Sequence, residues 1–293
     1  MSILLDSGPK LHRNEFRLIR DLINRFCGIA FQDDAMFLVE RRLRERLTAL
    51  GLRDYSEYYQ GLRYHPNAQN ELERAVELLT TNETYLFREQ YQLDAFMEEV
   101  LPGLRYSAER RESRRLAIWS AGCSTGEEVY TLAILIAHTG LFEGWEVRIF
   151  GNDISRSVLV TARRAIYGES SFRAMPPEYS RYFVEVAEGR QVHPRIRAMC
   201  SFGHLNLMAG DRAAIVGKVD AVFCRNVLIY FDVASRGEVI TTFYDRLLPG
   251  GYLLLGHSES LLNISTAFEL VHLSSDLVYR RPDSARGSSK REE

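Results

Sequence analysis

Up to about residue 80, apolar and polar positions alternate with the period of an α-helix. Two apolar stripes recur every three or four residues: Phe16, Ile19, Ile23 and Phe26, then Met36, Val39, Leu43, Leu47 and Leu50. Gly51 directly follows the second stripe, as is typical of a helix C-terminus. Shorter stripes at 55–62 and 72–79 predict two more helices. The pattern therefore predicts an all-helical N-terminal region.

From residue 116 onward, short apolar runs alternate with helical segments. The pattern predicts strands at 116–120, 147–152, 219–224 and 252–256, with helices near 127–138, 155–165 and 232–247. This alternation is typical of an α/β fold with a parallel sheet and right-handed crossovers. The segment 107–115 is expected to be an exposed loop.

Two segments depart from that alternation. Between 168 and 205, Pro176-Pro177 predicts the start of a short helix, and 192–202 predicts a small β excursion. Near the C-terminus, 268–270 and 277–280 predict a hairpin-like pair of strands.

Composition narrows the class of protein. The chain has 293 residues and a net charge of −2, which excludes a general attraction to nucleic acid or anionic membranes. Neither a membrane-spanning apolar run nor a secretory signal pattern is present, so a cytoplasmic protein is expected. The four cysteines form no C-x-x-C pair, which favours buried thiols over a metal site or disulfides.

Residues 116–128 are the most informative stretch. An apolar run of strand character enters Gly122-Cys123-Ser124-Thr125-Gly126 and then a helical pattern. Such a turn brings backbone N–H groups close to a nucleotide-like ligand. The next apolar run ends at Asp153, and an acid at a strand tip suits the hydroxyls of a ribose. Together these features predict an adenosine-bearing cofactor.

The residues after the second glycine narrow the choice of cofactor. A phosphate-binding P-loop needs Lys there, whereas this chain has Glu127 and Glu128, and the spacing is not G-x-G-x-x-G. Two carboxylates repel a pyrophosphate but tolerate S-adenosylmethionine, whose sulfonium and amino groups are cationic. A plain strand-to-helix connection in another α/β protein remains the alternative.

Two further stretches place polar residues beside the predicted sheet. Thr80–Glu89 either puts Arg88 over a bound ligand or forms an ordinary helix N-cap. Arg225, Asn226 and Tyr230 follow the third predicted strand, at the edge where open α/β sheets bind ligands, and the alternative for Tyr230 is a packing aromatic. The [ND]-P-P-[YF] sequence that grips a flipped base is absent here, which argues against a nucleic-acid substrate.

The second predicted helix carries a row of arginines on its polar face: Arg41, Arg42, Arg44 and Arg46. Such a row is either a solvated helix face or a docking surface for an acidic protein partner.

Five motifs, in this order, resemble the CheR-type chemotaxis receptor methyltransferases. They are Thr80–Glu89, Ala121–Glu128, Asn152–Ile154, Phe223–Phe231 and Gly256–Glu259. The resemblance covers nearly the whole chain, to about residue 280. Leu86 departs from the family, which usually has Phe there, but keeps the apolar bulk.

The resemblance implies the class I S-adenosylmethionine-dependent methyltransferase fold, a Rossmann-like α/β fold whose mostly parallel sheet has an antiparallel last strand. It implies a helical domain at 1–88, a methyltransferase domain at 89–282 with a β subdomain inserted at about 168–205, and a disordered tail at 283–293. The implied activity methylates glutamate side chains on the cytoplasmic helices of transmembrane chemoreceptors and leaves S-adenosylhomocysteine.

Matching positions give the implied cofactor contacts: Asn82, Thr84, Arg88, Glu128, Asp153, Asn206, Leu207, Asn226 and Val227. The resemblance puts Arg88 and Tyr230 nearest to the transferred methyl, as catalytic residues, and implies no metal. A glutamate carboxylate is already ionised at neutral pH and the sulfonium is an activated donor, so the reaction chiefly needs alignment. We expect Arg88, Tyr230 or both to orient the carboxylate, Glu128 to meet the amino-acid end of the cofactor, and Asp153 its ribose.

The expected partner is the receptor itself. Some family members dock a receptor C-terminal peptide on the β subdomain through a longer glycine-rich loop. Here 184–191 is short and has one glycine, which predicts no high-affinity pentapeptide tether. The arginines at 41–46 then become candidates for receptor binding, and a monomer is expected. Two alternatives remain: an enzyme of this build acting on another carboxylate, and a non-catalytic cofactor sensor or scaffold.

Overall fold

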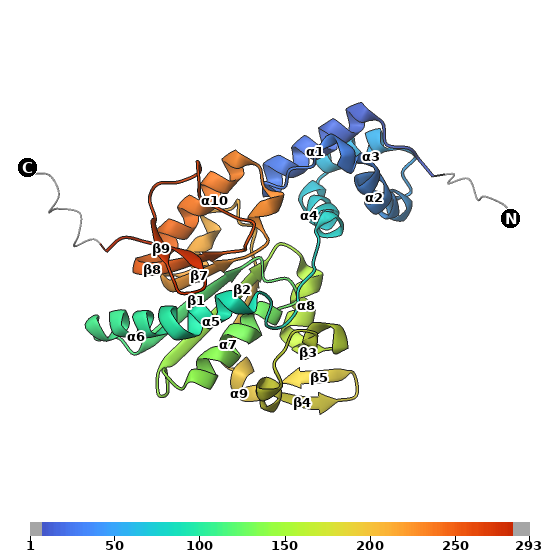
Figure 1. Ribbon diagram of the computed structural model, residues 1–293. Coiled ribbons are helices and arrows are strands. Elements are labelled where there is room, and N and C mark those ends of the chain that lie inside the picture. The colour runs from blue at the N-terminus through green and yellow to red at the C-terminus, as the bar shows by residue number, and fades with distance from the viewer. Residues whose placement is uncertain (1–7, 284–293) are drawn as a thin grey trace, which may run out of the picture. The chain divides into compact units, whose positions relative to one another are not determined.

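The computed structural model describes residues 8–283, which divide into two compact units (Figure 1). Unit 1 holds the described residues up to Thr81 together with Tyr230–Asp232, and unit 2 holds the rest. The units therefore divide after Thr81, whereas the expected domain boundary was residue 88. The expected disordered tail lies outside the described residues from 284 onward. Among residues 8–283, every helix falls short of the length and apolarity that crossing a membrane requires.

Within its described residues, unit 1 is built from packed helices. They are α1 (Arg13–Cys27), η1 (Asp33–Ala35), α2 (Met36–Leu50), α3 (Tyr55–Tyr64) and α4 (Ala68–Leu79). The predicted stripes supply the buried side chains of α1 and α2, among them Phe16, Ile19, Ile23, Val39, Leu43 and Leu47. Gly28 and Gly51 end these helices with left-handed φ values of 77° and 66°. The predicted helical region is confirmed.

Unit 2 contains a seven-stranded sheet with the order β6-β2-β1-β7-β8-β10-β9. The strands are β1 (Arg115–Ala121), β2 (Glu146–Asp153), β6 (Cys200–His204), β7 (Val219–Cys224), β8 (Leu247–Leu255), β9 (Glu269–His272) and β10 (Leu277–Arg280). The first five strands in that order pair in parallel, while β10 pairs antiparallel with both β8 and β9. The expected mostly parallel sheet with an antiparallel last strand is confirmed.

Helices cover both faces of this sheet, and Figure 1 shows α7 and α10 on opposite sides. The helices are α5 (Gln90–Ala95), η2 (Phe96–Val100), α6 (Leu101–Arg110), α7 (Glu127–Thr139), α8 (Arg156–Arg164) and α10 (Val233–Arg246). Trp119 of β1 meets Phe243 of α10 with ring centroids 5.1 Å apart. Phe223 of β7, which pairs with Ser120, points to the other face and meets Phe96 at 5.0 Å. Double coverage explains why every residue of β7 is buried.

The inserted β subdomain is a three-stranded antiparallel sheet with the order β3-β5-β4. Its elements are β3 (Ile166–Tyr167), η3 (Glu169–Phe172), η4 (Pro177–Tyr182), β4 (Phe183–Val186), β5 (Gly189–Val192) and α9 (Pro194–Arg197). The two remaining short helices are η5 (Arg212–Val216) and η6 (Leu228–Tyr230).

Two expectations need correction. The excursion expected at 192–202 is wrong in its second half, because β6 belongs to the main sheet and pairs in parallel with Ile149–Asp153 of β2. The exposed loop expected at 107–115 is also wrong in part, because α6 continues to Arg110. The charged side chains that suggested a loop lie on the outer turns of this helix, where Glu109 and Arg110 are exposed.

Candidate active site

The turn between β1 and α7 is folded onto the end of β2. The backbone N–H groups of Gly122 and Cys123 both donate to Asn152 O, at 2.9 and 2.8 Å. Gly122 has a φ of 76°, and a Cβ there would lie 2.5 Å from a methyl of Val227. The position therefore needs glycine both for its left-handed backbone and for the close approach of Val227.

Backbone strain gathers around this turn. Seven non-glycine residues among 8–283 have positive φ, and four lie in the turn itself or in the two loops that approach it: Phe87 (60°), Glu89 (59°), Ser124 (48°) and Asn226 (58°). Such conformations are costly and persist where the surrounding structure imposes them, often at functional sites. Two of the four residues flank Arg88.

Asp153, the last residue of β2, lies directly beneath the turn. Its carboxylate accepts the N–H of Ser124 at 2.8 Å and of Ser155 at 2.9 Å. Burial raises the pKa of Asp153, while these backbone donors act in the opposite direction. The backbone of Ile154 acts on the carboxylate in the same direction. A carboxylate has about four lone-pair sites, so these backbone bonds still leave capacity for a hydroxyl of a ribose.

Asn206 and Leu207 follow β6 at the same edge of the sheet. The preceding Leu205 donates its N–H to Asp153 O at 3.1 Å and accepts the side-chain amide of Asn152 at 3.0 Å. Asn206 Oδ1 accepts the N–H of Met208 at 3.0 Å. The fold thus brings the 205–207 segment next to Asp153, as the sequence motifs predict.

Glu128, in the first turn of α7, is tied into a buried ion-pair cluster around Arg225. One Glu128 oxygen accepts from Ser120 Oγ at 2.8 Å, and the other accepts from Arg225 Nε at 2.7 Å. Arg225 is only 8% exposed and also donates to Gln92 Oε1 at 3.1 Å and to Arg88 O at 2.9 Å. We call Arg225, Glu128 and Glu89 the Arg225 cluster.

The Arg225 cluster is unbalanced. Glu89 Oε2 lies 3.6 Å from Arg225 Nη1, and this buried oxygen makes no hydrogen bond in the described part of the chain. Two formal negative charges therefore face one positive charge. Buried charges in proteins are normally paired, so the arrangement suits a cationic ligand group.

The loop that carries Arg88 touches the glycine turn. Ser124 Oγ donates to Asn82 O at 3.1 Å, and Phe87 N donates to Thr131 Oγ1 of α7 at 3.1 Å. Asn82, Thr84 and Arg88 are half-buried. The Arg88 guanidinium donates to Glu83 O at 3.1 Å.

Glu259 holds the segment that follows β7, a role that the sequence motifs alone did not reveal. Its carboxylate accepts four backbone N–H groups, from Asn226 (2.8 Å), Val227 (3.0 Å), Ile229 (3.2 Å) and Gly256 (2.8 Å). Burial raises the pKa of Glu259, and the four donors act in the opposite direction. The only signal in the sequence was its place in the motif Gly256–Glu259.

Tyr230 belongs to unit 1, whereas Arg88 belongs to unit 2. In unit 1, Tyr230 O accepts the N–H of Ala30 at 2.8 Å, and Phe231 forms an antiparallel bridge with Ile29. The Tyr230 side chain is 39% exposed, so it is not a core aromatic. That Arg88 and Tyr230 act on the same methyl stays a prediction.

The arginine row of α2 is not an open face. Arg42 donates to the carbonyls of Leu78, Leu79 and Thr80 at the end of α4, at 2.9–3.2 Å. Arg44 pairs with Glu40, and Arg46 pairs with Glu71, each at 2.8 Å. Arg41 alone among the four is exposed. The alternative of a wholly solvated face therefore does not hold, because three of the four arginines bind groups of unit 1, and receptor binding by these arginines stays a prediction.

The sheet order and the glycine turn over an acidic strand tip define a class I methyltransferase domain. A family model described as "CheR methyltransferase, SAM binding domain" matches residues 82–277, and one described as "CheR methyltransferase, all-alpha domain" matches residues 14–80. The chain therefore belongs to the CheR methyltransferase family, and S-adenosylmethionine is its cofactor.

Relatives agree with this assignment over nearly the full length. Chemotaxis protein methyltransferase 2 of Vibrio cholerae is 33% identical over 94% of this chain and 96% of its own. Chemotaxis protein methyltransferase 1 of Pseudomonas aeruginosa is 35% identical over 91% and 97%. The chemotaxis protein methyltransferase of Salmonella typhimurium is 34% identical over 92% of each chain. The expected family, fold and cofactor are confirmed.

The described residues fit this cofactor. The Arg225 cluster has a surplus negative charge and one buried oxygen without a hydrogen bond, which suits a ligand with a sulfonium and an ammonium group. Asp153 keeps accepting capacity at the tip of β2. Lysine or arginine, which a phosphate ligand needs, is absent from the turn between residues 122 and 126.

Proposed function

We propose that the protein transfers the methyl group of S-adenosylmethionine to glutamate carboxylates of chemoreceptors, forming methyl esters for sensory adaptation. The observation that carries this proposal is the match of both units, in order, to the two domains of the CheR family. A methyltransferase domain that acted on a small acid would not need the helical unit. The enzyme would act in the cytoplasm as a monomer.

The cofactor supplies an electrophilic methyl on a sulfonium when it is bound. Asp153 would accept the ribose hydroxyls, and the unbalanced charge of the Arg225 cluster would hold the cationic amino-acid end through Glu128 and Glu89. Asn82, Thr84, Asn206, Leu207, Asn226 and Val227 would complete the walls of the cofactor site. Since Glu128 already pairs with Arg225, its contribution would be shared with Glu89 rather than exclusive.

Arg88 and Tyr230 would orient the substrate carboxylate. This nucleophile is ionised at neutral pH, so the protein needs to align it with the methyl and exclude water rather than remove a proton. A hydrogen bond from the Tyr230 hydroxyl would orient one oxygen without the full charge neutralisation that weakens a nucleophile. The positive φ values on both sides of Arg88 fix the direction in which its side chain leaves the backbone.

Receptor contact would involve α2. Arg41 is exposed, and Phe37, one turn earlier on the same helix, is 68% exposed. An exposed cation beside an exposed aromatic suits an acidic, amphipathic receptor helix. Arg42, Arg44 and Arg46 would support this face by fixing α2 within unit 1.

A high-affinity peptide tether would be lacking. The β4–β5 hairpin has only Ala187 and Glu188 between its strands, and the sole glycine of 184–191 opens β5. Calorimetry against a receptor C-terminal pentapeptide should therefore give no binding at micromolar concentrations. Micromolar binding would refute this part of the proposal.

The activity is tested by incubating the purified protein with labelled S-adenosylmethionine and receptor-containing membranes. We expect a base-labile label on the receptor, because methyl esters hydrolyse in alkali. Label on another protein or on a small acid would favour the alternative substrate, and absence of any label with intact cofactor binding would favour the sensor.

Variants separate the assigned roles. Arg88→Ala and Tyr230→Phe should each lower turnover by roughly 100-fold, a loss typical of a positioned group that acts in the transition state. Arg41→Glu should instead raise the KM for receptor with kcat unchanged. If both Arg88→Ala and Tyr230→Phe keep normal turnover, the catalytic assignment is wrong.

A further inference from the structure

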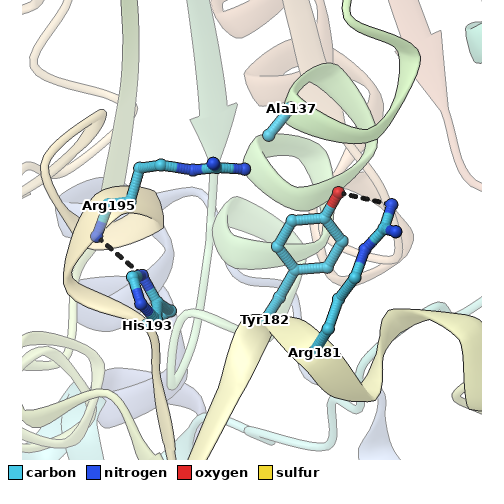
Figure 2. A pocket seen from close by; sticks show the side chains of 5 residues that line it. All are labelled: Ala137, Arg181, Tyr182, His193 and Arg195. Carbon is cyan, nitrogen blue, oxygen red and sulfur yellow. Dashed lines mark hydrogen bonds between the residues drawn. The ribbon is translucent and has the colours of Figure 1, made fainter.

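A second candidate binding site lies in unit 2, at the end of α7 away from the glycine turn. It is a cavity of about 370 Å³ lined by Ala137 of α7, Arg181 and Tyr182 of η4, and His193 and Arg195 at the start of α9 (Figure 2). This volume is at the small end of the range for small-molecule pockets. None of these residues belongs to the cofactor site described above.

The lining of this cavity consists almost entirely of hydrogen-bond donors. Three of its five residues are basic, one is a tyrosine, and none is acidic. Arg181 and Arg195 are exposed and form no ion pair with any carboxylate among residues 8–283, unlike Arg46 and Arg225, which each pair with a glutamate. Their charges are therefore uncompensated within the described structure.

Two neighbouring side chains contact the Arg181 guanidinium. The Arg181 guanidinium donates to Tyr182 Oη at 3.2 Å and contacts His138 Nδ1 at 3.0 Å (Figure 2 shows the first bond). The buried Tyr182 ring forms the wall between Arg181 and Arg195 in that view. These contacts orient the Arg181 guanidinium, and neither partner is a carboxylate that would neutralise its charge.

His193 is also prepared as a donor. Its Nδ1 accepts the backbone N–H of Arg195 at 3.2 Å. In the neutral imidazole the proton must then reside on Nε2, which becomes a hydrogen-bond donor. The arginines are not there to cap the C-terminus of α7, because among the described residues neither the Arg181 nor the Arg195 guanidinium donates to a carbonyl of that helix.

We propose that this cavity binds the phosphoryl group of a small phosphorylated molecule. Guanidinium groups match the oxygens of a phosphoryl group, and the two positive charges of Arg181 and Arg195 balance its charge of about −2 better than that of a single carboxylate. The small volume favours a free metabolite over a macromolecule. The acidic residues nearest in sequence, Glu178 and Glu185, are exposed and do not line the cavity.

Calorimetry on the full-length protein tests the site, with saturating S-adenosylhomocysteine present so that the cofactor site is filled. The probes are glucose 6-phosphate, inorganic phosphate and, as the uncharged control, glucose. We expect glucose 6-phosphate to bind, glucose not to bind, and the variant with both Arg181→Ala and Arg195→Ala to bind at least tenfold more weakly. Binding of inorganic phosphate as tight as that of the ester would assign the site to free phosphate, within the same proposal.

Arg110→Ala is the matched control, because Arg110 is an exposed arginine of unit 2 that also lacks an ion pair among the described residues. It should change the affinity for glucose 6-phosphate by less than twofold. Unchanged S-adenosylhomocysteine affinity in the double variant shows that it is folded. Equal binding of the ester by the wild type and the double variant, or none by the wild type at millimolar concentration and low salt, overturns the proposal.

Discussion

Each unit contains a buried cluster in which one arginine meets glutamate, and the two clusters differ in their charge balance. In unit 1, both Arg46 nitrogens facing Glu71 lie 2.8 Å from its oxygens, and Tyr58 Oη donates to the same carboxylate at 2.9 Å. Burial, followed by the charge of Glu71, raises the pKa of Tyr58, which keeps it a donor. One positive charge thus faces one negative charge, with every glutamate oxygen bonded.

The Arg225 cluster of unit 2 uses the same chemistry without this balance. It sets Glu128 and Glu89 against one arginine and leaves Glu89 Oε2 without a hydrogen bond. A complete pair such as Arg46–Glu71 stabilises the native packing. A cluster with an unpaired carboxylate, such as the Arg225 cluster, keeps a negative charge that a cationic ligand can neutralise. Charge balance therefore distinguishes a structural cluster from a binding cluster more clearly than burial does.

The largest expected effect is that of Arg225→Ala. Removing the only cation would leave Glu128 and Glu89 buried and unpaired, so we expect the free energy of unfolding to fall by about 3–5 kcal/mol. Urea denaturation measures this loss. Arg225→Lys, which keeps the charge but reaches fewer partners, should recover part of it, and a loss below about 1 kcal/mol in Arg225→Ala would contradict the buried pairing.

Arg46→Ala should have a smaller effect, confined to stability. It leaves a partly buried carboxylate with only the tyrosine as partner, which typically costs about 1.5–3 kcal/mol. Denaturation monitored by circular dichroism gives the stability, and calorimetry gives the affinity for S-adenosylhomocysteine. That affinity should stay within twofold of the wild type; a larger change would mean that the balanced cluster is also functional.

Glu89→Gln tests the unbalanced charge directly. Neutralising the surplus carboxylate should weaken S-adenosylmethionine binding roughly tenfold, or about 1.4 kcal/mol, without lowering the free energy of unfolding. Glu71→Gln is the matched substitution in unit 1 and should do the reverse, lowering stability while leaving cofactor affinity alone. The comparison fails if both variants affect the same property.

The smallest effect is expected for Glu127→Gln. Glu127 is buried at the start of α7, forms no ion pair among the described residues, and accepts from Thr125 Oγ1 at 2.6 Å and Ser171 Oγ at 2.9 Å. Burial raises its pKa, opposed by these hydroxyls. A raised folded-state pKa means that ionisation destabilises the native state as pH rises from acid to neutral.

The amide has nearly the same shape without the charge: its oxygen accepts from one of the two hydroxyl groups, and its NH2 donates to the other. Glu127→Gln should therefore gain about 0.5–1 kcal/mol over the wild type at neutral pH, and this advantage should vanish at acidic pH. Urea denaturation of both proteins across this pH range measures the difference. If the stability advantage of Glu127→Gln grew as the pH fell, the pKa of Glu127 would be lowered and not raised by folding.

The central strands and α7 could be predicted from sequence because each contains a run of apolar residues, and β1, β2, β8 and α7 end at or next to a glycine or an acid. β6 could not be assigned to its sheet, because Cys200–His204 is short and half-buried at the sheet edge, with no alternation to distinguish it from the nearby insert. The last turn of α6 was predicted as a loop because it is exposed and charged.

The sequence motifs indicate which positions belong to the candidate site, but not the hydrogen bonds and ion pairs that connect them. The motifs indicate Glu128, Asp153 and Asn226, since each follows a predicted strand or turn. That Arg225 would pair with Glu128, 97 positions earlier, depends on how the chain folds over the sheet. The role of Glu89 depends on its left-handed backbone, which no residue preference predicts for glutamate.

The carboxylate of Glu259 has a mechanical consequence. It accepts backbone N–H groups from Asn226, Val227 and Ile229, which follow β7, and from Gly256, which follows β8. The segments after these two strands must therefore move together. Different substrate glutamates would then be accommodated by rotation of side chains on these two segments, whose backbone stays in place, and not by movement of a loop. Hydrogen exchange should accordingly release the four gripped amides in a single cooperative opening.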